Sequence, residues 1–147
     1  KKLQVFERNR YVYCHVSPLA WLFYYEDEKY NISEWKITWV EFQRIANDLL
    51  PHIMEDQLRE FIAQEKGLVE TVVQEKEFGV DGLLLRFKKP EIAIEVKWKG
   101  KIDKNDVAEA EKNLAMVNAK QKWLVVPDKK LVKIKTKLKI VDVTDFL

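Results

Sequence analysis

The residues with the clearest chemical potential are two acids and a lysine near the middle of the chain, Asp81, Glu95 and Lys97. Glu95 and Lys97 are separated by one residue in a β-rich run, so both side chains point to the same face of the predicted strand. A turn near Lys89 folds the preceding run back, which brings Asp81 opposite residues near Lys97 and within reach of Glu95. The spacing predicts that the three side chains converge on one side of one β-hairpin.

Two facing carboxylates repel each other unless a cation lies between them. Mg²⁺ suits such a pair because proteins hold it through one or two carboxylates together with phosphate oxygens and water. A neighbouring lysine can orient a water molecule or neutralise charge on the phosphorus under attack. Asp81, Glu95 and Lys97 therefore favour metal-assisted phosphodiester hydrolysis, with Mg²⁺ or Mn²⁺ as the cofactor. The alternative is that the three residues form a solvated cross-strand ion pair.

The elements that would position these residues are those of an α/β domain. Runs of strand-like composition cover residues 68–74, 79–87, 91–98, 123–126 and 131–143. The turn of the hairpin is expected at residues 88–90, and a helix is expected after Asp103. The run at 123–126 is continuously apolar, as in a buried strand. Strands interrupted by one helix and preceded by others predict an α/β sandwich with a central mixed sheet.

The first 36 residues differ from the rest because they hold nine aromatic side chains. We interpret residues 1–36 as an aromatic-rich, partly helical segment that docks other protein parts, and residues 37–147 as one domain. At the start of this domain, Thr38 caps a helix that Pro51 is expected to break or kink, and a second amphipathic run continues to about Glu65.

The composition limits the class of protein. No stretch approaches 18 apolar residues, so no membrane span is expected. A single cysteine cannot form an internal disulfide, and no secretory leader opens the chain, so we expect a cytoplasmic location. High Lys and Glu content with only two Met is typical of thermophiles.

The charges are unevenly distributed along the chain. Residues 1–85 hold 10 Lys and Arg against 15 Asp and Glu, whereas residues 86–139 hold 16 against 7. A basic half suggests a polyanionic partner, although lysines also simply solubilise exposed faces. The best candidates for phosphate contacts are Lys99, Lys101 and Lys104, because they lie just beyond the run that carries Glu95 and Lys97.

Asp81 followed by Glu95-Val96-Lys97 resembles the PD-(D/E)XK nuclease signature, although Val80 stands where the name of that signature has Pro. The resemblance implies a three-layer, restriction-endonuclease-like core. It also implies a metal held by Asp81, Glu95 and the Val96 carbonyl, with Lys97 assisting the attacking water. This superfamily has an acidic residue on the preceding helix, and Glu55 occupies the matching place as an outer or second-metal ligand.

Glu95-Val96-Lys97-Trp98 further resembles a segment in the C-terminal domain of archaeal-type P-loop ATPases. The stretch from Tyr13 to Tyr25 is similar to the segment that follows the winged helix in that family, with Ser17 where the family usually has Asp. This chain has no Gly-rich phosphate loop. The resemblance therefore implies a C-terminal nuclease module that acts on DNA, with the ATPase and winged-helix parts elsewhere. The alternative is an inactive nuclease-fold scaffold for protein–protein interaction or DNA clamping.

Overall fold

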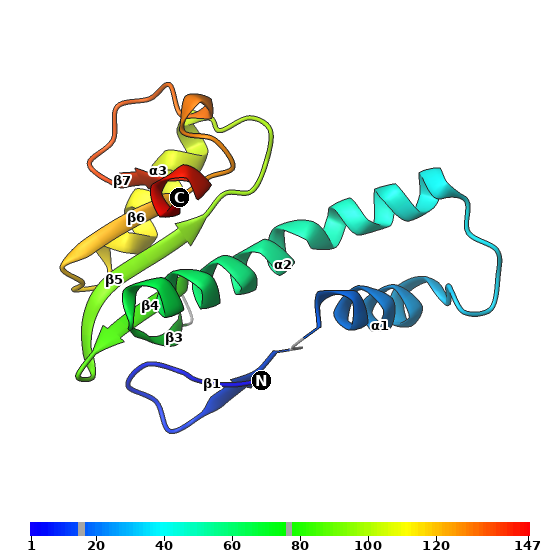
Figure 1. Ribbon diagram of the computed structural model, residues 1–147, viewed down its shortest axis with the longest axis horizontal. Helices are drawn as coiled ribbons and strands as arrows, with labels where there is room; N and C mark the ends of the chain where they lie inside the picture. Colours follow the sequence, from blue (N-terminus) through cyan, green and yellow to red (C-terminus); the bar gives the residue numbers. More distant parts are fainter. Residues whose placement is uncertain (15–16, 76–77) are drawn as a thin grey trace.

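The centre of the computed structural model, which describes residues 1–14, 17–75 and 78–147, is a five-stranded mixed sheet (Figure 1). In spatial order its strands are β3 (Val69–Gln74), β4 (Gly79–Arg86), β5 (Lys89–Val96), β6 (Gln121–Val125) and β7 (Lys139–Val141). β4 pairs antiparallel with β3 and with β5, whereas β6 pairs in parallel with β5 and with β7. The predicted α/β class, mixed sheet and antiparallel hairpin are confirmed.

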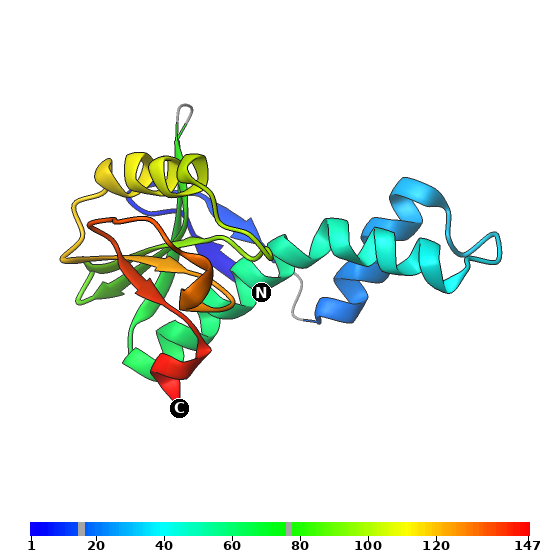
Figure 2. The same ribbon diagram turned by 90° about the horizontal axis from the view of Figure 1, so that it is seen from above.

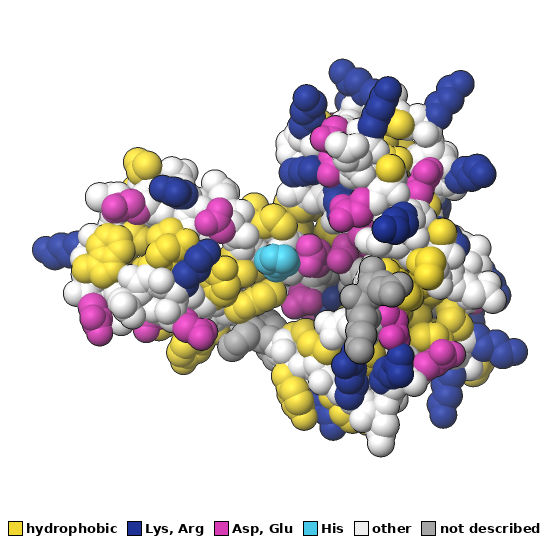
Figure 3. All heavy atoms as spheres, turned by 180° about the vertical axis from the view of Figure 1, so that it is seen from behind, with side chains coloured by type: hydrophobic (Ala, Val, Ile, Leu, Met, Phe, Trp, Pro, Cys, Tyr) yellow, Lys and Arg dark blue, Asp and Glu magenta, His cyan; other side chains and the backbone are white. Residues whose placement is uncertain are grey.

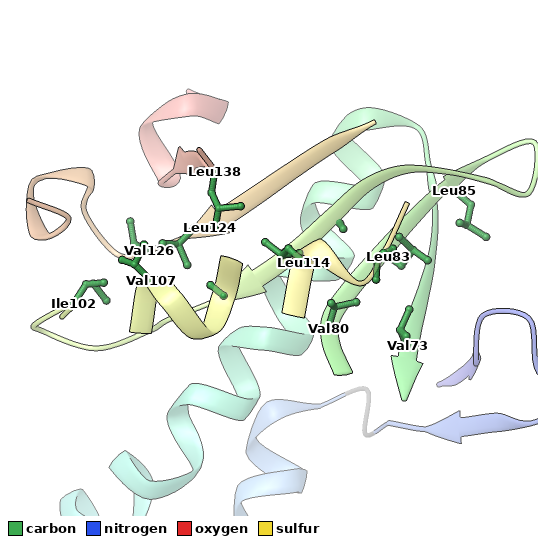
Figure 4. Close-up of a cluster of buried hydrophobic side chains, with 13 residues drawn as sticks. Val73, Val80, Leu83, Leu85, Ile102, Val107, Leu114, Leu124, Val126 and Leu138 are labelled. Carbon is green, nitrogen blue, oxygen red and sulfur yellow. The ribbon is translucent and has the colours of Figure 1, made fainter. Parts of the chain in front are cut away.

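Helices pack on both faces of this sheet. α2 (Trp39–Lys66) and α3 (Lys104–Ala115) cover the two faces, whereas α1 (Pro18–Tyr30) packs on α2. α3 contributes Val107, Ala110 and Leu114 to a buried cluster on one face (Figure 4). The last turns of α2 contribute Ile62 and Ala63 to a second buried cluster. The β-strand residues of this cluster point to the face of the sheet opposite α3. None of the helices in the described ranges is long and apolar enough to span a bilayer.

A small two-stranded sheet extends the molecule on the β3 side. β1 (Lys2–Gln4) pairs antiparallel with β2 (Tyr11–Tyr13), and Val5 bridges to Val72 of β3. Leu3, Val5 and Val72 are buried together, so the start of the chain is packed against the main sheet.

α1 and the first half of α2 form a helical hairpin, residues 18–50, that projects from the sheet and is called the arm below (Figures 1 and 2). The arm starts at the Ser17 cap, whose hydroxyl accepts from the Ala20 N–H, and its two helices contact each other. Buried at this contact is Glu26, whose two carboxyl oxygens have no hydrogen-bond partner in the described part of the chain. Several large apolar side chains of the arm are exposed, among them Leu19, Phe23 and Trp39.

The expected break at Pro51 is wrong, because α2 runs without interruption for 28 residues. The capping box at Thr38 forms as predicted. Proline removes one backbone donor from the helix. Buried side chains lie on both sides of it, with Leu49 before and Ile62 after, and this packing holds the two halves in one helix.

The turn of the β4–β5 hairpin lies at Phe87 and Lys88 rather than at residues 88–90. Both residues have positive φ, 51° and 62°, which is the conformation of a two-residue type I′ turn. Pro90 instead belongs to β5 and faces Leu85, where the register between the two strands shifts.

The long strand expected at residues 131–143 is also wrong. Only Lys139–Val141 pairs with β6, and short 3₁₀ helices cover Lys129–Leu131 and Val143–Phe146. The inward half of the alternation nevertheless holds, because Val132, Ile134 and Leu138 pack against the cluster under α3. A loop attached to α3 therefore buries these side chains, with Glu111 accepting hydrogen bonds from Thr136 Oγ1 and the Lys137 N–H.

Candidate functional site

Asp81 and Glu95 lie across from each other on β4 and β5, one residue beyond the paired Gly82 and Ile94. The Asp81 Oδ2 atom accepts a hydrogen bond of 2.7 Å from the Val96 N–H. Glu95 is only 3% exposed, and its carboxyl group interacts directly with that of Asp81. The hairpin therefore brings together the two acids that the sequence singled out.

Lys97 faces the same pocket as the two acids. Its Nζ atom lies 3.9 Å from Glu95 Oε2 and 2.8 Å from Glu109 Oε2 on α3. Burial lowers the pKa of Lys97, but the hydrogen bond to Glu109 and the charge of Glu95 together raise it by more, so the net shift is upward. Lys97 is therefore a fixed positive charge beside Glu95, as the alternation along β5 predicts.

Glu55 approaches the acids from α2, where the sequence placed it. It lines the same pocket as Asp81 and Glu95, and its Oε2 atom is 3.3 Å from His52 Nδ1. Burial raises the pKa of Glu55, and the charge of Asp81 raises it further. Three carboxyl groups from one helix and two strands thus share this pocket.

The pocket has a volume of about 520 Å³ and lies between α2, α3, the β3–β5 strands and the N-terminal segment. Figure 3 shows acidic side chains gathered in a hollow between the arm and the rest of the molecule. Its wall on the N-terminal side is formed by Val12, Tyr13, Cys14 and Trp21. The aromatic segment and the hairpin, which the sequence analysis treated separately, therefore meet at one site.

Arg59 is the pocket residue that sequence reasoning missed most clearly. Its side chain is almost fully buried, and its Nη1 atom donates a hydrogen bond of 2.8 Å to the Asp81 carbonyl. It also forms ion pairs with Asp56 and Glu70. The available signal was Gly82 within an apolar strand, because a Cβ atom at that position would lie 3.0 Å from Arg59 Cγ.

α3 supplies two further residues that the sequence analysis did not select. Asn113 Nδ2 donates a hydrogen bond of 3.2 Å to Glu95 Oε1, which fixes the orientation of that carboxyl group. Glu109 holds the Lys97 ammonium group. They lie four residues apart on an amphipathic helix, a spacing that places both on one face. The sequence could have indicated this face of α3, because the spacing of its apolar residues identifies the buried face and leaves Glu109 and Asn113 on another.

The electrostatics of the pocket favour binding of a cation. Burial raises the pKa of Glu95 to about 8, and the charge of Asp81 contributes to this shift. Burial also raises the pKa of Asp81, although the Val96 N–H and Lys97 oppose the shift. Two carboxyl groups this close do not both ionise easily without a compensating charge.

Asp81 and Glu95 line the pocket with carboxylate oxygens of the kind that Mg²⁺ or Mn²⁺ binds, and Mg²⁺ needs only one or two carboxylates because it keeps several waters. Val96, whose carbonyl the sequence analysis offered as a third ligand, is not among the described residues that line the pocket. Within residues 1–14, 17–75 and 78–147, no group of three or more His, Cys, Asp or Glu side chains is placed so that it could hold a metal ion.

The three lysines expected to contact phosphate lie between β5 and the start of α3. Lys99 is exposed, but its Nζ atom pairs with Asp106 Oδ1 at 2.6 Å, so part of its charge is already offset. Lys101 and Lys104 are exposed. They remain the stronger candidates for contacts with a polyanion.

Comparison with known proteins gives no match: no family model, no curated protein and no solved structure matches the chain. The nuclease interpretation therefore depends on the residues of the pocket and their geometry.

Proposed function

We propose that this chain is a metal-dependent nuclease domain with a restriction-endonuclease-like core, which hydrolyses phosphodiester bonds of DNA. The observation that carries the proposal is the pair of adjacent acids, the half-buried Asp81 and the buried Glu95, with the Lys97 ammonium group 3.9 Å from Glu95. Two adjacent acids whose pKa values are both raised by burial are costly for a fold, and such costs concentrate at functional sites. A cross-strand ion pair with Lys97 would need only one of these two carboxyl groups.

In this proposal Asp81, Glu95 and the Val96 carbonyl hold the metal ion. The bound ion supplies two things, a lower pKa for its water ligands and charge neutralisation at the phosphate. Asp81 is suited to this task because only one of its carboxylate oxygens, Oδ2, is used by the Val96 N–H. Asn113 keeps Glu95 turned toward the pocket through its hydrogen bond to Oε1.

Lys97 would act on the substrate. Its ammonium group cannot ligate a cation, but it can orient the attacking water and stabilise the negative charge that develops on the phosphorus oxygens. Its present contact with Glu109, at 2.8 Å, keeps it charged and within 3.9 Å of Glu95. Glu55 would serve as an outer ligand or as a ligand to a second metal, since it shares the pocket from the side of α2.

We further propose that the domain is the C-terminal module of an archaeal-type ATPase. The support is the Glu95-Val96-Lys97-Trp98 segment and the exposed apolar side chains of the arm, which suit contact with other protein parts. Lys101 and Lys104 would contact the DNA backbone beyond the hydrolysed bond.

The test separates metal binding from cleavage. We expect Asp81→Ala to abolish both Mn²⁺ binding, measured by titration calorimetry, and cleavage of single-stranded, duplex or branched DNA. Lys97→Ala should abolish cleavage but leave Mn²⁺ affinity unchanged or slightly higher, because a nearby positive charge is removed. The matched control is Glu91→Ala on the same strand, where Glu91 pairs with Lys120 and does not line the pocket.

The second candidate function is an inactive scaffold with the same fold. It is favoured by the short contact between Lys97 and Glu109, which a purely structural ion pair would also make. The scaffold predicts no Mn²⁺ binding and no cleavage, and a cost of about 0–1 kcal/mol of stability for either substitution. Equal loss of Mn²⁺ binding in Asp81→Ala and Lys97→Ala would contradict the role assigned to Lys97.

A further inference from the structure

The pocket also has aromatic lining residues that metal binding does not require. Tyr13 on β2 and Trp21 on α1 line the same 520 Å³ cavity as Asp81 and Glu95. Trp21 is half-buried, whereas Tyr13 is 75% exposed, so much of its ring is accessible to a ligand. One pocket therefore presents both carboxylates and an accessible aromatic ring.

Carboxylates and an aromatic ring would bind different parts of a nucleotide. A phosphate oxygen can join a metal held by Asp81 and Glu95, while a base can stack on an aromatic ring. Base stacking is tolerant of sequence because every base has a π-face. We propose that the pocket recognises an unpaired nucleotide, with the phosphodiester at Asp81 and Glu95 and the adjacent base stacked on Tyr13, an inference that rests on the proposed nuclease function.

Duplex DNA does not offer a base in this way. Within a double helix each base is paired and stacked on its neighbours, so its π-face is not available to a protein ring unless the nucleotide is flipped out or unpaired. Glu95, which lines the pocket, is only 3% exposed, so a nucleotide must enter the pocket to reach it. Single-stranded ends, gaps and flaps therefore fit this pocket better than an intact duplex does.

The charge of the pocket adds a second condition for binding. The acids that line it are Glu55, Asp56, Asp81, Glu95 and Glu109. Among the described lining residues, the positively charged ones are Arg59 and Lys97. This excess of negative charge repels a phosphodiester unless a divalent cation is present, so binding of the strand and of the metal should be coupled.

The test measures binding rather than cleavage. A fluorescein-labelled 12-nucleotide thymidine strand, the same strand with abasic sites in place of bases, and a 12-base-pair duplex are titrated in Ca²⁺ and followed by anisotropy. We expect the thymidine strand to bind most tightly. Tyr13→Ala should weaken that binding by about tenfold, within the range known for loss of one stacked base. Tyr13→Phe should retain it, and the affinity of the abasic strand should not change.

Tyr11→Ala is the matched control, because Tyr11 lies on the same strand but does not line the pocket. Equal effects of Tyr11→Ala and Tyr13→Ala, or tighter binding of the duplex than of the thymidine strand, would overturn the inference. The proposed nuclease function has its own readout, Mn²⁺ binding by the unsubstituted protein and its loss in Asp81→Ala. A protein that binds Mn²⁺ through Asp81 but does not discriminate the three nucleic acids keeps its function and loses only this inference.

Discussion

Glu95 keeps its proton at a pH at which an exposed glutamate is ionised. Burial raises its pKa from the ordinary 4.5 to about 8, and the neighbouring Asp81 charge adds to the effect. A carboxyl group must lose its proton before it can ligate a metal ion. Protons and metal ions therefore compete for this residue in the neutral pH range.

The competition predicts that Mn²⁺ affinity rises with pH. We expect the apparent affinity to increase between about pH 6 and pH 8, by at most about tenfold per pH unit, and then to level off. Calorimetric titrations in buffers of different ionisation enthalpy would also detect the released proton. An affinity that is constant across this range would show that Glu95 is not a ligand.

The raised pKa of Glu95 also affects the stability of the metal-free protein. The free energy of unfolding falls as pH rises from about 4.5 toward 8, because the folded protein holds a proton on Glu95 that the unfolded chain has lost.

At the scale of elements, the site depends on a close approach between α2 and β4. Gly82 leaves room for the Arg59 side chain, which spans from Asp56 and Glu70 to the Asp81 carbonyl. A buried charge in this position is tolerated only because it is paired on several sides. The helix and the strand are thus connected through one side chain, directly behind the proposed metal ligand.

Gly82→Ala should disturb this connection. The added Cβ atom would lie 3.0 Å from Arg59 Cγ and 3.2 Å from Cδ, so the buried Arg59 side chain would have to shift by a few tenths of an ångström. We expect a loss of about 1–3 kcal/mol in the free energy of unfolding and weaker Mn²⁺ binding. Gly100→Ala is the control, because a Cβ atom there meets nothing within 4 Å. Urea denaturation and calorimetry measure the two effects, and equal behaviour of the two variants would refute the proposed contact between Gly82 and Arg59.

The sequence predicted those parts of the fold that depend on local patterns. The spacing of Glu95 and Lys97 and the change to a period of two residues were sufficient to place the hairpin. Local patterns failed where tertiary contacts decide, as at Pro51, where packing on both sides keeps α2 continuous. They failed again at residues 131–143, where inward side chains are buried by a loop rather than a strand. Gly82 within the strand signalled a close approach, but the identity of its partner, Arg59, depends on the distance between a helix and a strand, which no local pattern gives.

At the scale of the whole molecule, the arm contains a buried side chain, Glu26, that reduces its stability. Glu26 lies buried between α1 and α2 without a hydrogen bond in the described part of the chain. Burial raises its pKa, and Asp48 adds to the shift while Lys29 opposes it. Between its ordinary pKa of 4.5 and the raised value, the folded protein binds more protons than the unfolded chain, so this group reduces stability as pH rises.

Glu26→Gln should therefore stabilise the protein at pH 8, by about 1 kcal/mol, because a neutral amide costs less to bury than a carboxylate. The gain should decrease as the pH is lowered toward 4.5, where Glu26 is itself neutral. Glu28→Gln, an exposed position on the same helix, is the control and should change little. Chemical denaturation at several pH values measures the difference. A gain that is independent of pH would show that ionisation of Glu26 is not what destabilises the arm.

Because α2 is one continuous helix, it connects the outer end of the arm directly to the pocket. At a rise of 1.5 Å per residue, Trp39 lies about 30 Å along the helix from Arg59, whereas Glu55 lies about 6 Å from it. If the buried Arg59 is the fulcrum, a tilt of about 5° displaces the outer end by about 2.6 Å and Glu55 by about 0.5 Å. Catalytic groups must be held within about 0.5 Å of their productive geometry. A partner that tilts the arm in this way would therefore move Glu55 relative to Asp81 and Glu95, which lie on the sheet.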